Sequence, residues 1–272
     1  MAENSKIEWT ATRLPDGRVF PGYTFNPYTG CTKVSPGCDH CYAEGWSKRS
    51  GHVKWGPHGQ RRRTSDANWK LPLKWNAEAQ ASGIRRKVFC ASLADVFDNH
   101  ASILEHWRTD LWELIASTPH LDWLLLTKRP QNIRRFLPDQ FHLGFAPQAW
   151  GNGWPNVWLG TTVVNRDEML RDAPKLKAVS AAVRFWSVEP ILGDLGDIPR
   201  DLLPDWVICG GESGPGARVW DGFEDAARSL RDQCRSAGVA FFMKQMAGAR
   251  KASMPPIPAD LMIREMPGVA HD

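Results

Sequence analysis

Short runs of apolar residues alternate with amphipathic stretches over most of the chain. Runs rich in β-branched and aromatic residues predict strands, which fall at residues 88–93, 122–127, 156–161, 183–188, 205–210 and 239–244. A further short strand is predicted within residues 22–27. Stretches with helical periodicity separate the runs, at residues 102–117, 130–137, 166–177 and 223–238. The pattern therefore predicts a repeat of strand and helix.

Several predicted strands are apolar at every position, which is typical of parallel strands buried on both faces. Parallel strands joined by crossover helices commonly form a TIM-like (β/α) barrel, complete or partial. We therefore predict an α/β fold with a single barrel domain over residues 1–272. An open doubly wound sheet is the alternative, because local pattern does not distinguish the two. Residues 48–75 are predicted to be a basic loop insertion, and the Pro- and Met-rich tail, 245–272, to lie across the body.

Polar residues stand where the predicted strands end. They include Ser92 and Asp95, Lys128 and Arg129, Thr161 and Thr162, Glu189, Gly210 to Ser213, and Lys244. Barrel enzymes place their sites at this edge of the sheet. Capping of the following helices explains Ser92 and Asn165 equally well. It explains the glycine pair before Glu212 less well, because glycine lets backbone approach a ligand closely.

Basic residues are concentrated in one segment. Residues 48–74 hold eight basic residues and one acid, a net charge of +7 against +4 for the whole chain. Tryptophans are interleaved with this charge, and single-stranded nucleic acids are bound by such a combination of phosphate neutralisation and base stacking. The alternative is a solvated loop whose tryptophans pack on the body. The predicted nucleic-acid-binding residues are Lys54, Trp55, Arg61, Arg62, Arg63 and Trp69.

Composition is that of a soluble globular protein, with 42% hydrophobic and 24% charged residues. No uncharged apolar run approaches the roughly 18 residues of a membrane helix, so no membrane contact is expected. The first residues are polar and lack the apolar core of a secretory signal. A cytoplasmic location without disulfide bonds is therefore expected.

Three of the six cysteines, Cys31, Cys38 and Cys41, lie within residues 26–44 in a C-x6-C-x2-C spacing. Six cysteines are too few for a disulfide scaffold in a chain of 272 residues, so the group indicates a metal or redox site. Zinc needs a fourth ligand, and the nearest is His40, which adjoins Cys41 and reaches the same ion only with strain. A [4Fe-4S] cluster held by three thiolates leaves one iron open. The spacing is compatible with both.

The cysteine segment and several other motifs resemble one family. Those motifs are RRRTSDANW, LLLTKRP, WLGTTV, SVEPILG, WVICGGESGPGAR and FFMKQ. Together they resemble the phage-associated three-cysteine-motif proteins of the radical S-adenosylmethionine superfamily, from Ile7 to Pro267. A more distant resemblance, in the cysteine loop and inferred barrel, is to the spore photoproduct lyases.

The resemblance implies a barrel of the radical S-adenosylmethionine type in which Cys31, Cys38 and Cys41 bind a [4Fe-4S] cluster. In that superfamily the fourth iron binds the amino and carboxylate groups of S-adenosylmethionine. Reduction by an external donor of the flavodoxin or ferredoxin type then cleaves the cofactor to a 5′-deoxyadenosyl radical, which abstracts hydrogen from a substrate.

Positions at the strand ends carry further roles by the same resemblance. His40 stands where an aromatic residue usually precedes the last cysteine. Apart from the resemblance, Cys209 ends a predicted strand beside the glycine pair, where a thiol could return a hydrogen atom to a substrate radical; core packing is the alternative. The implied catalytic residues are Glu212, Cys209 and Lys244. The implied cofactor-binding residues are His40, Tyr42, Ser92, Asp95, Lys128, Arg129, Thr161, Thr162, Glu189, Gly210 and Gly211.

Two features depart from the superfamily pattern. Most members have C-x3-C-x2-C, whereas the first gap here is six residues. Residues 11–23 are an additional stretch, whose Pro-Asp-Gly sequence predicts a turn and hairpin. Neither departure removes a ligand. Cys90 and Cys234 are expected to be buried small hydrophobes.

Two functions of different classes fit the sequence. The first is a radical S-adenosylmethionine enzyme, a lyase or modifying enzyme, acting on nucleic acid or a nucleotide. The second is a non-catalytic nucleic-acid-binding protein with a structural zinc or iron–sulfur site. The polar strand ends favour the first, because a structural metal module has no need of a binding rim.

Overall fold

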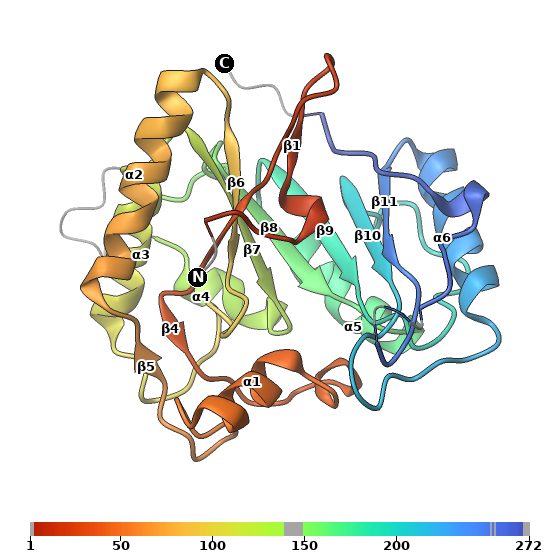
Figure 1. The fold of residues 1–272 in the computed structure, drawn as a ribbon, viewed down its shortest axis with the longest axis horizontal. Helices are drawn as coiled ribbons and strands as arrows, with labels where there is room; N and C mark the ends of the chain where they lie inside the picture. The colour runs from red at the N-terminus through yellow and green to blue at the C-terminus, as the bar shows by residue number, and fades with distance from the viewer. Residues whose placement is uncertain (1–2, 139–148, 251, 253, 269–272) are drawn as a thin grey trace. The chain divides into compact units, whose positions relative to one another are not determined.

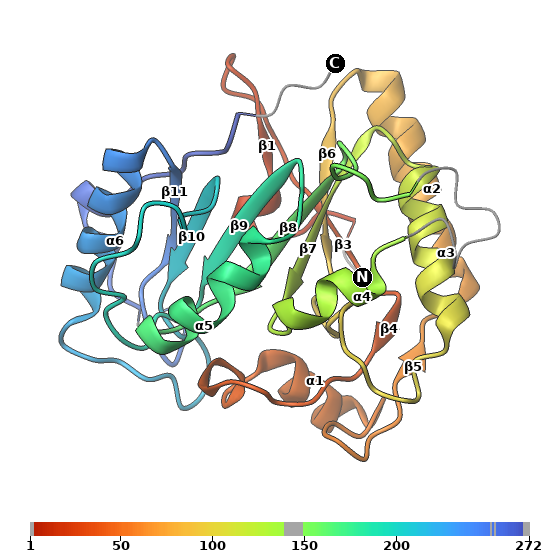
Figure 2. The ribbon, with the colours of Figure 1, turned by 180° about the vertical axis from the view of Figure 1, so that it is seen from behind.

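A computed structural model describes residues 3–138, 149–250, 252 and 254–268 of the chain, shown from two opposite sides in Figures 1 and 2. Two compact units can be distinguished. The first contains residues 1–32, 43–158 and 180–182, and the second contains residues 33–42, 159–179 and 183–272. The single domain expected from the sequence stays a prediction.

Seven strands form one parallel sheet in the order β11-β10-β9-β8-β7-β6-β3. They are β3 (Tyr23–Phe25), β6 (Arg86–Cys90), β7 (Leu121–Thr127), β8 (Val157–Thr162), β9 (Val183–Val188), β10 (Trp206–Gly210) and β11 (Ala240–Gln245). The order follows the chain without reversal, whereas a doubly wound sheet reverses at its switch point. The predicted α/β fold with a partial TIM-like sheet is therefore confirmed, and the doubly wound alternative is wrong.

All seven predicted strands are present, within a few residues of their expected bounds. Every residue of β8 and of β10 is buried, and β7 is buried at all positions except Leu126. This burial on both faces is the physical reason for the continuous apolar runs in the sequence. Cys90 and Cys234 are fully buried, as expected.

The first unit contains the following helical elements. They are α1 (Tyr42–Ser50, whose first residue belongs to the second unit), α2 (Asp66–Ser82), α3 (Glu105–Ala116), α4 (Ile133–Phe136) and the 3-10 turns η1 (Glu8–Thr10) and η3 (Pro130–Asn132). α2 packs against β6 and β7. The helix predicted at residues 102–117 is α3, which begins three residues later and ends one residue earlier, and the one predicted at residues 130–137 consists of η3 and α4.

The sequence pattern did not predict α2. The helix begins after Ser65, whose hydroxyl accepts a hydrogen bond from the Asn68 N–H, and ends at Gly83 in the left-handed conformation, φ +66°. Its buried face consists of Asn68, Pro72, Trp75 and Ala79. Spacing along this face is helical, but an asparagine and a proline interrupt the apolar stripe. Part of the predicted basic insertion, from Asp66 onward, is therefore helix.

The second unit contains two long helices. Its helical elements are η2 (Pro36–Cys38), α5 (Arg166–Lys177), α6 (Phe223–Ala237) and η5 (Ala259–Leu261). α5 begins after Asn165, whose side chain accepts a hydrogen bond from the Glu168 N–H at 2.9 Å, so capping explains this residue. α6 packs against β11 and ends at Gly238. Both helices match the predicted ranges.

Two short sheets lie outside the main one. β1 (Thr12–Arg13) and β2 (Val19–Phe20) form an antiparallel hairpin, which confirms the turn predicted at Pro-Asp-Gly (Figure 1). β4 (Tyr28–Thr29) pairs with β5 (Arg62–Arg63). Within the described ranges, no helix has both the length and the apolar character that crossing a membrane requires.

The tail runs along the edge of β11. The Met243 N–H donates to the Ile263 carbonyl at 2.9 Å, and the Glu265 N–H donates to the Phe241 carbonyl at 3.0 Å. Arg264 forms an antiparallel bridge with Phe242. Residues 263–265 therefore pair with β11 within the second unit.

Candidate functional site

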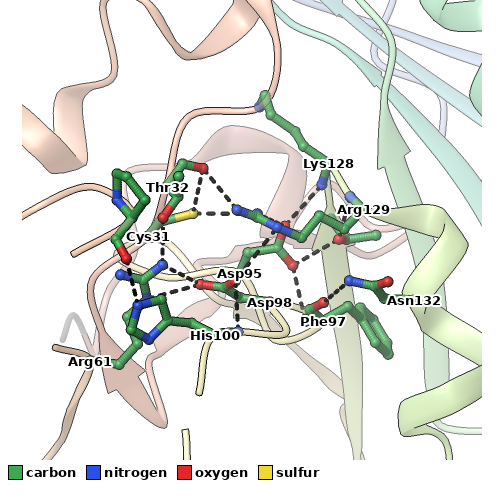
Figure 3. Close-up of polar contacts among 12 residues, drawn as sticks. Cys31, Thr32, Arg61, Asp95, Phe97, Asp98, His100, Lys128, Arg129 and Asn132 are labelled. Carbon is green, nitrogen blue, oxygen red and sulfur yellow. Dashed lines mark hydrogen bonds and ion pairs between the residues drawn. The ribbon is translucent and has the colours of Figure 1, made fainter. Parts of the chain in front are cut away.

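Neighbouring parallel strands bring three loops of the first unit together (Figure 3). β3 leads into the cysteine segment, β6 leads into residues 92–98, and β7 leads into residues 128–129. Asn26 joins the first two loops, since its amide donates to the Ser92 hydroxyl at 3.1 Å and accepts from the Leu93 N–H at 2.7 Å. Ser92 therefore helps to hold the loops after β3 and β6 together.

Four charged side chains form a buried network beneath these loops. They are Arg61, Asp95, Asp98 and Arg129, and each is at most 5% exposed. Arg61 pairs with Asp98 at 2.7 Å, and Arg129 pairs with Asp95 at 2.9 Å. The Arg129 Nε also lies 3.6 Å from Asp98, which links the two pairs. Two cations and two anions balance one another, which a buried charge cluster requires.

Asp95 connects this network to the loop after β7. Its carboxylate accepts hydrogen bonds from the Thr127 hydroxyl at 2.7 Å and from the backbone N–H groups of Phe97 and Lys128 at 3.0 and 3.1 Å. Both carboxylate oxygens are therefore engaged by protein groups. The Lys128 side chain extends away from Asp95 in Figure 3.

Cys31 borders the same network. Its Sγ lies 3.5 Å from the Arg129 Nη1, and the other terminal nitrogen of Arg129 donates to the Thr32 carbonyl at 2.8 Å. Enclosure by protein, together with the Asp95 charge, raises the pKa of the Cys31 thiol to about 12, although Arg129 acts to lower it. The structure brings the predicted residues Cys31, Asp95 and Arg129 together.

A second polar network lies wholly within the second unit, around Glu212. Arg218 donates to both carboxylate oxygens of Glu212, at 2.8 and 2.5 Å, and His40 Nδ1 lies 3.1 Å from the same carboxylate. Arg218 also donates to Asp39 at 3.1 Å and to the Pro36 carbonyl at 2.9 Å. The loop after β10 is therefore bound directly to the segment that carries Cys38 and Cys41.

Glu212 is held in its ionised form by these contacts. Burial acts to raise the pKa of Glu212, but the hydrogen bonds from Arg218 and His40 lower it to about 2. The Nε2 edge of His40 lies against Gly216, where an added Cβ would be 3.3 Å from that nitrogen. His40 thus has a structural partner on each side of its ring. Tyr42, by contrast, is 62% exposed.

Glu189 and Lys244 form an ion pair of 2.9 Å in the second unit. They come from the ends of β9 and β11, and Gly210 at the end of β10 lies between these strands. A Cβ on Gly210 would be 2.7 Å from Glu189 Oε1, so the glycine leaves space for the carboxylate. Gly211 donates its N–H to the Gln245 carbonyl at 3.0 Å.

Three further predicted site residues are enclosed at strand ends of the second unit. Thr161 and Thr162 end β8 and are 0% and 2% exposed. Cys209 precedes the glycine pair and is fully buried, and burial raises the pKa of its thiol. A thiol in this setting stays protonated at neutral pH.

The basic segment divides into bound and exposed residues. Arg61 is buried on Asp98, and Arg63 lies over the Trp69 ring at 3.8 Å and pairs with Asp110 at 2.6 Å. Trp55 is partly buried. Exposed residues that form no ion pair with any described residue are Arg49, Lys54, Arg62 and Lys70.

Asp98, Thr32, Asp39 and Arg218 belong to the two networks but were not predicted. Thr32 directly follows Cys31, Asp39 directly follows Cys38, and Arg218 ends the quoted motif WVICGGESGPGAR. Their positions beside predicted residues or inside a quoted motif could have identified them. Asp98 lies three residues beyond Asp95 in the same strand-end loop.

The candidate metal ligands are the three cysteines of residues 26–44. Cys31, Cys38 and Cys41 are free and partly exposed, whereas Cys90, Cys209 and Cys234 are buried. Free, accessible thiols are the donors that iron–sulfur clusters use. Within the part of the chain that the structure describes, no three His, Cys, Asp or Glu side chains are gathered as a metal site.

Comparison with known proteins gives one family and one solved structure. A family model described as "Protein of unknown function (DUF5131)" matches residues 4–272. No curated protein matches the chain. The chain is similar to a solved spore photoproduct lyase mutant with bound AdoMet and dinucleoside spore photoproduct, with 14% identity and a TM-score of 0.44. The match covers 88% of this chain and 60% of that one.

Proposed function

The chain belongs to this family of unknown function, and we propose that it is a radical S-adenosylmethionine enzyme with a three-cysteine [4Fe-4S] site. The observation that carries the proposal is the contrast between its cysteines. All six cysteines are free, but the three that are close in sequence are partly exposed and the three elsewhere are buried. Iron can reach a partly exposed thiol, whereas buried structural cysteines are inert.

Cys31, Cys38 and Cys41 would hold three irons of the cluster, which leaves the fourth for the amino and carboxylate groups of S-adenosylmethionine. When bound and reduced, the cluster supplies the electron that cleaves the cofactor to a 5′-deoxyadenosyl radical. The resemblance of the sequence motifs, rather than the spacing alone, favours this cluster over zinc.

The protein's own groups would orient the site. Arg218 binds the cysteine segment through Asp39 and Pro36, and Glu212 holds His40. His40, held by Glu212 through Nδ1, keeps its implied role beside the cofactor in this proposal. The implied cofactor roles of Tyr42, Ser92, Asp95, Lys128, Arg129, Thr161, Thr162, Glu189, Gly210 and Gly211 stay part of the proposal, as do the catalytic roles of Glu212, Cys209 and Lys244.

Metal analysis tests the proposal. Protein purified without oxygen is expected to be brown and to contain about four irons and four acid-labile sulfides per chain. Cys38→Ala is expected to abolish this content, and Cys234→Ala, a change at a buried cysteine, is expected to preserve it. A single zinc without sulfide in the wild-type protein would refute the proposal and favour the structural-metal alternative.

Nucleic acid is the proposed class of substrate or partner, and the reductant is proposed to be a flavodoxin- or ferredoxin-type protein. Arg49, Lys54, Arg62 and Lys70 support the nucleic-acid assignment because they are exposed and form no ion pair with described residues. Binding of a single-stranded oligonucleotide is expected to weaken with salt and to weaken further in Arg62→Gln. Arg235→Gln, at an exposed arginine of α6, is the control. Equal binding by both variants would contradict the assignment.

A further inference from the structure

We propose that Arg129 is a positioning residue that holds Cys31 in place for iron and raises the reduction potential of the cluster through an N–H···S hydrogen bond. This inference rests on the proposed function. Arg129, Cys31, Thr32, Asp95 and Arg61 all belong to the first unit and are labelled in Figure 3.

Arg129 contacts the cysteine and the residue that follows it with two different nitrogens. Nη1 lies 3.5 Å from Cys31 Sγ and 2.9 Å from Asp95, while Nη2 donates to the Thr32 carbonyl at 2.8 Å. The guanidinium is planar, so these contacts fix its orientation as well as its position. The sulfur is consequently held at a defined place relative to a buried cation.

Thr32 is held from a second direction by Arg61. Nη2 of Arg61 donates to the Thr32 hydroxyl at 2.7 Å, and the same guanidinium is fixed by Asp98 at 2.7 Å. Arg61 also donates to the carbonyls of Gly56 and Gly59. Two buried arginines therefore converge on the residue next to Cys31, one on its carbonyl and one on its hydroxyl.

Asp95 prevents Arg129 from moving away from the sulfur. Its carboxylate is bound by the Thr127 hydroxyl and by two backbone N–H groups, so it is itself fixed to the sheet edge. Because the ion pair is buried, water does not compete for it. The donor to the sulfur is thus preorganised before any metal is bound.

The other two cysteines lack this arrangement. Neither the Cys38 nor the Cys41 thiol has a hydrogen-bonding partner among the residues of the described chain, whereas Cys31 has the Arg129 guanidinium. A hydrogen bond to a ligating sulfur withdraws electron density from it and makes reduction of the cluster easier. The iron bound by Cys31 would therefore be distinguished electronically from the other two.

The experiment compares Arg129→Gln and Arg129→Lys with the wild-type protein and with Arg135→Gln, which removes an exposed arginine from α4. Iron and sulfide content, the midpoint potential of the cluster, and the rate of iron release to a chelator are measured. Arg129→Gln is expected to shift the potential to a more negative value and to accelerate iron release about 10–100-fold. Arg129→Lys, which keeps the charge without the planar fork, is expected to accelerate release with a smaller shift in potential.

A second variant tests whether the changes in Arg129→Gln come from misfolding. Arg129→Gln leaves Asp95 buried without its cation, so Asp95→Asn/Arg129→Gln, which removes both charges, is measured beside it. The double variant is expected to keep the circular dichroism spectrum of the wild type and to show the same shift and faster release. Wild-type potential and release rate in a folded double variant would overturn the inference.

Failure of the proposed function gives a different result. If the wild-type protein itself binds no iron and sulfide, the proposed function is wrong and this inference falls with it. If the wild-type protein carries the cluster and the Arg129 variants match it, only the role of Arg129 is wrong.

Discussion

Removing either partner of the buried Arg61–Asp98 pair is expected to destabilise the protein strongly. The Arg61 side chain is 0% exposed and that of Asp98 is 3% exposed, and two guanidinium nitrogens donate to one carboxylate oxygen at 2.9 and 2.7 Å. Arg61→Met keeps the length of the side chain but leaves the Asp98 carboxylate with only the longer ion pair to Arg129 Nε, at 3.6 Å. Breaking a buried pair in this way costs about 3–5 kcal/mol.

A double variant isolates the interaction energy between Arg61 and Asp98 from their contacts with other residues. Asp98→Asn is expected to cost a similar amount, since it leaves the Arg61 guanidinium buried without its anion. Arg61→Met/Asp98→Asn removes both charges, so its cost is expected to fall short of the sum of the single costs by about 3 kcal/mol. The difference measures the coupling between the two side chains.

Urea unfolding of the metal-free protein, followed by tryptophan fluorescence and extrapolated linearly, gives each free energy of unfolding. The matched control is the exposed pair Lys74 and Glu78, which are four residues apart on α2 and 3.8 Å from one another. Its coupling is expected to be about 0.3–0.5 kcal/mol. A coupling below about 1 kcal/mol for Arg61 and Asp98 would refute the account of a buried, mutually dependent pair.

Two further predictions concern the second unit. Glu212→Gln is expected to lower the free energy of unfolding by about 1–3 kcal/mol at neutral pH. Because the pKa of Glu212 is lowered from 4.5 to about 2 in the folded protein, this contribution is present above about pH 4.5 and is lost as the pH falls toward 2. Urea titrations at about pH 7 and about pH 3 check it, and an equal difference at both pH values would contradict it. Gly211→Ala is expected to lower the free energy of unfolding by about 1–3 kcal/mol, because the new Cβ would be 2.3 Å from the Ala247 backbone nitrogen. Gly193→Ala is the control, since its new Cβ would have its nearest atom at 3.7 Å, and its stability is expected to be nearly unchanged. Thermal unfolding of both variants measures the difference.

The fold could be predicted where burial on both faces leaves a simple pattern. β8 and β10 are buried at every position, so their sequences are continuous apolar runs with polar residues only at the end. α2 could not be predicted because tertiary packing buries Asn68 and Pro72 on its inner face. The Asn68 amide donates to the Asn26 carbonyl and to the Thr64 hydroxyl, so its burial depends in part on Asn26, which is distant in the sequence.

The sequence indicated where along the chain the candidate site residues lie, but not which side chains they contact. Strand-end residues such as Asp95 and Arg129 were indicated, since parallel strands place their carboxyl ends at one edge. The three consecutive arginines at residues 61–63 show that the sequence does not reveal the environment of each side chain. Arg61 is buried on Asp98, Arg62 is exposed, and Arg63 packs on Trp69, although the sequence presents them identically. Only the pairing of Arg62 and Arg63 with Thr29 and Tyr28 assigns them to opposite sides.

The bridge between Arg264 and Phe242 has a consequence for self-association. A terminal strand whose N–H and carbonyl groups face solvent is a template onto which another chain can add by main-chain pairing. Residues 263–265 occupy those groups on β11, and the Glu265 carboxylate also accepts the Phe241 N–H at 2.9 Å. The tail of the second unit therefore shields this border against intermolecular β-pairing.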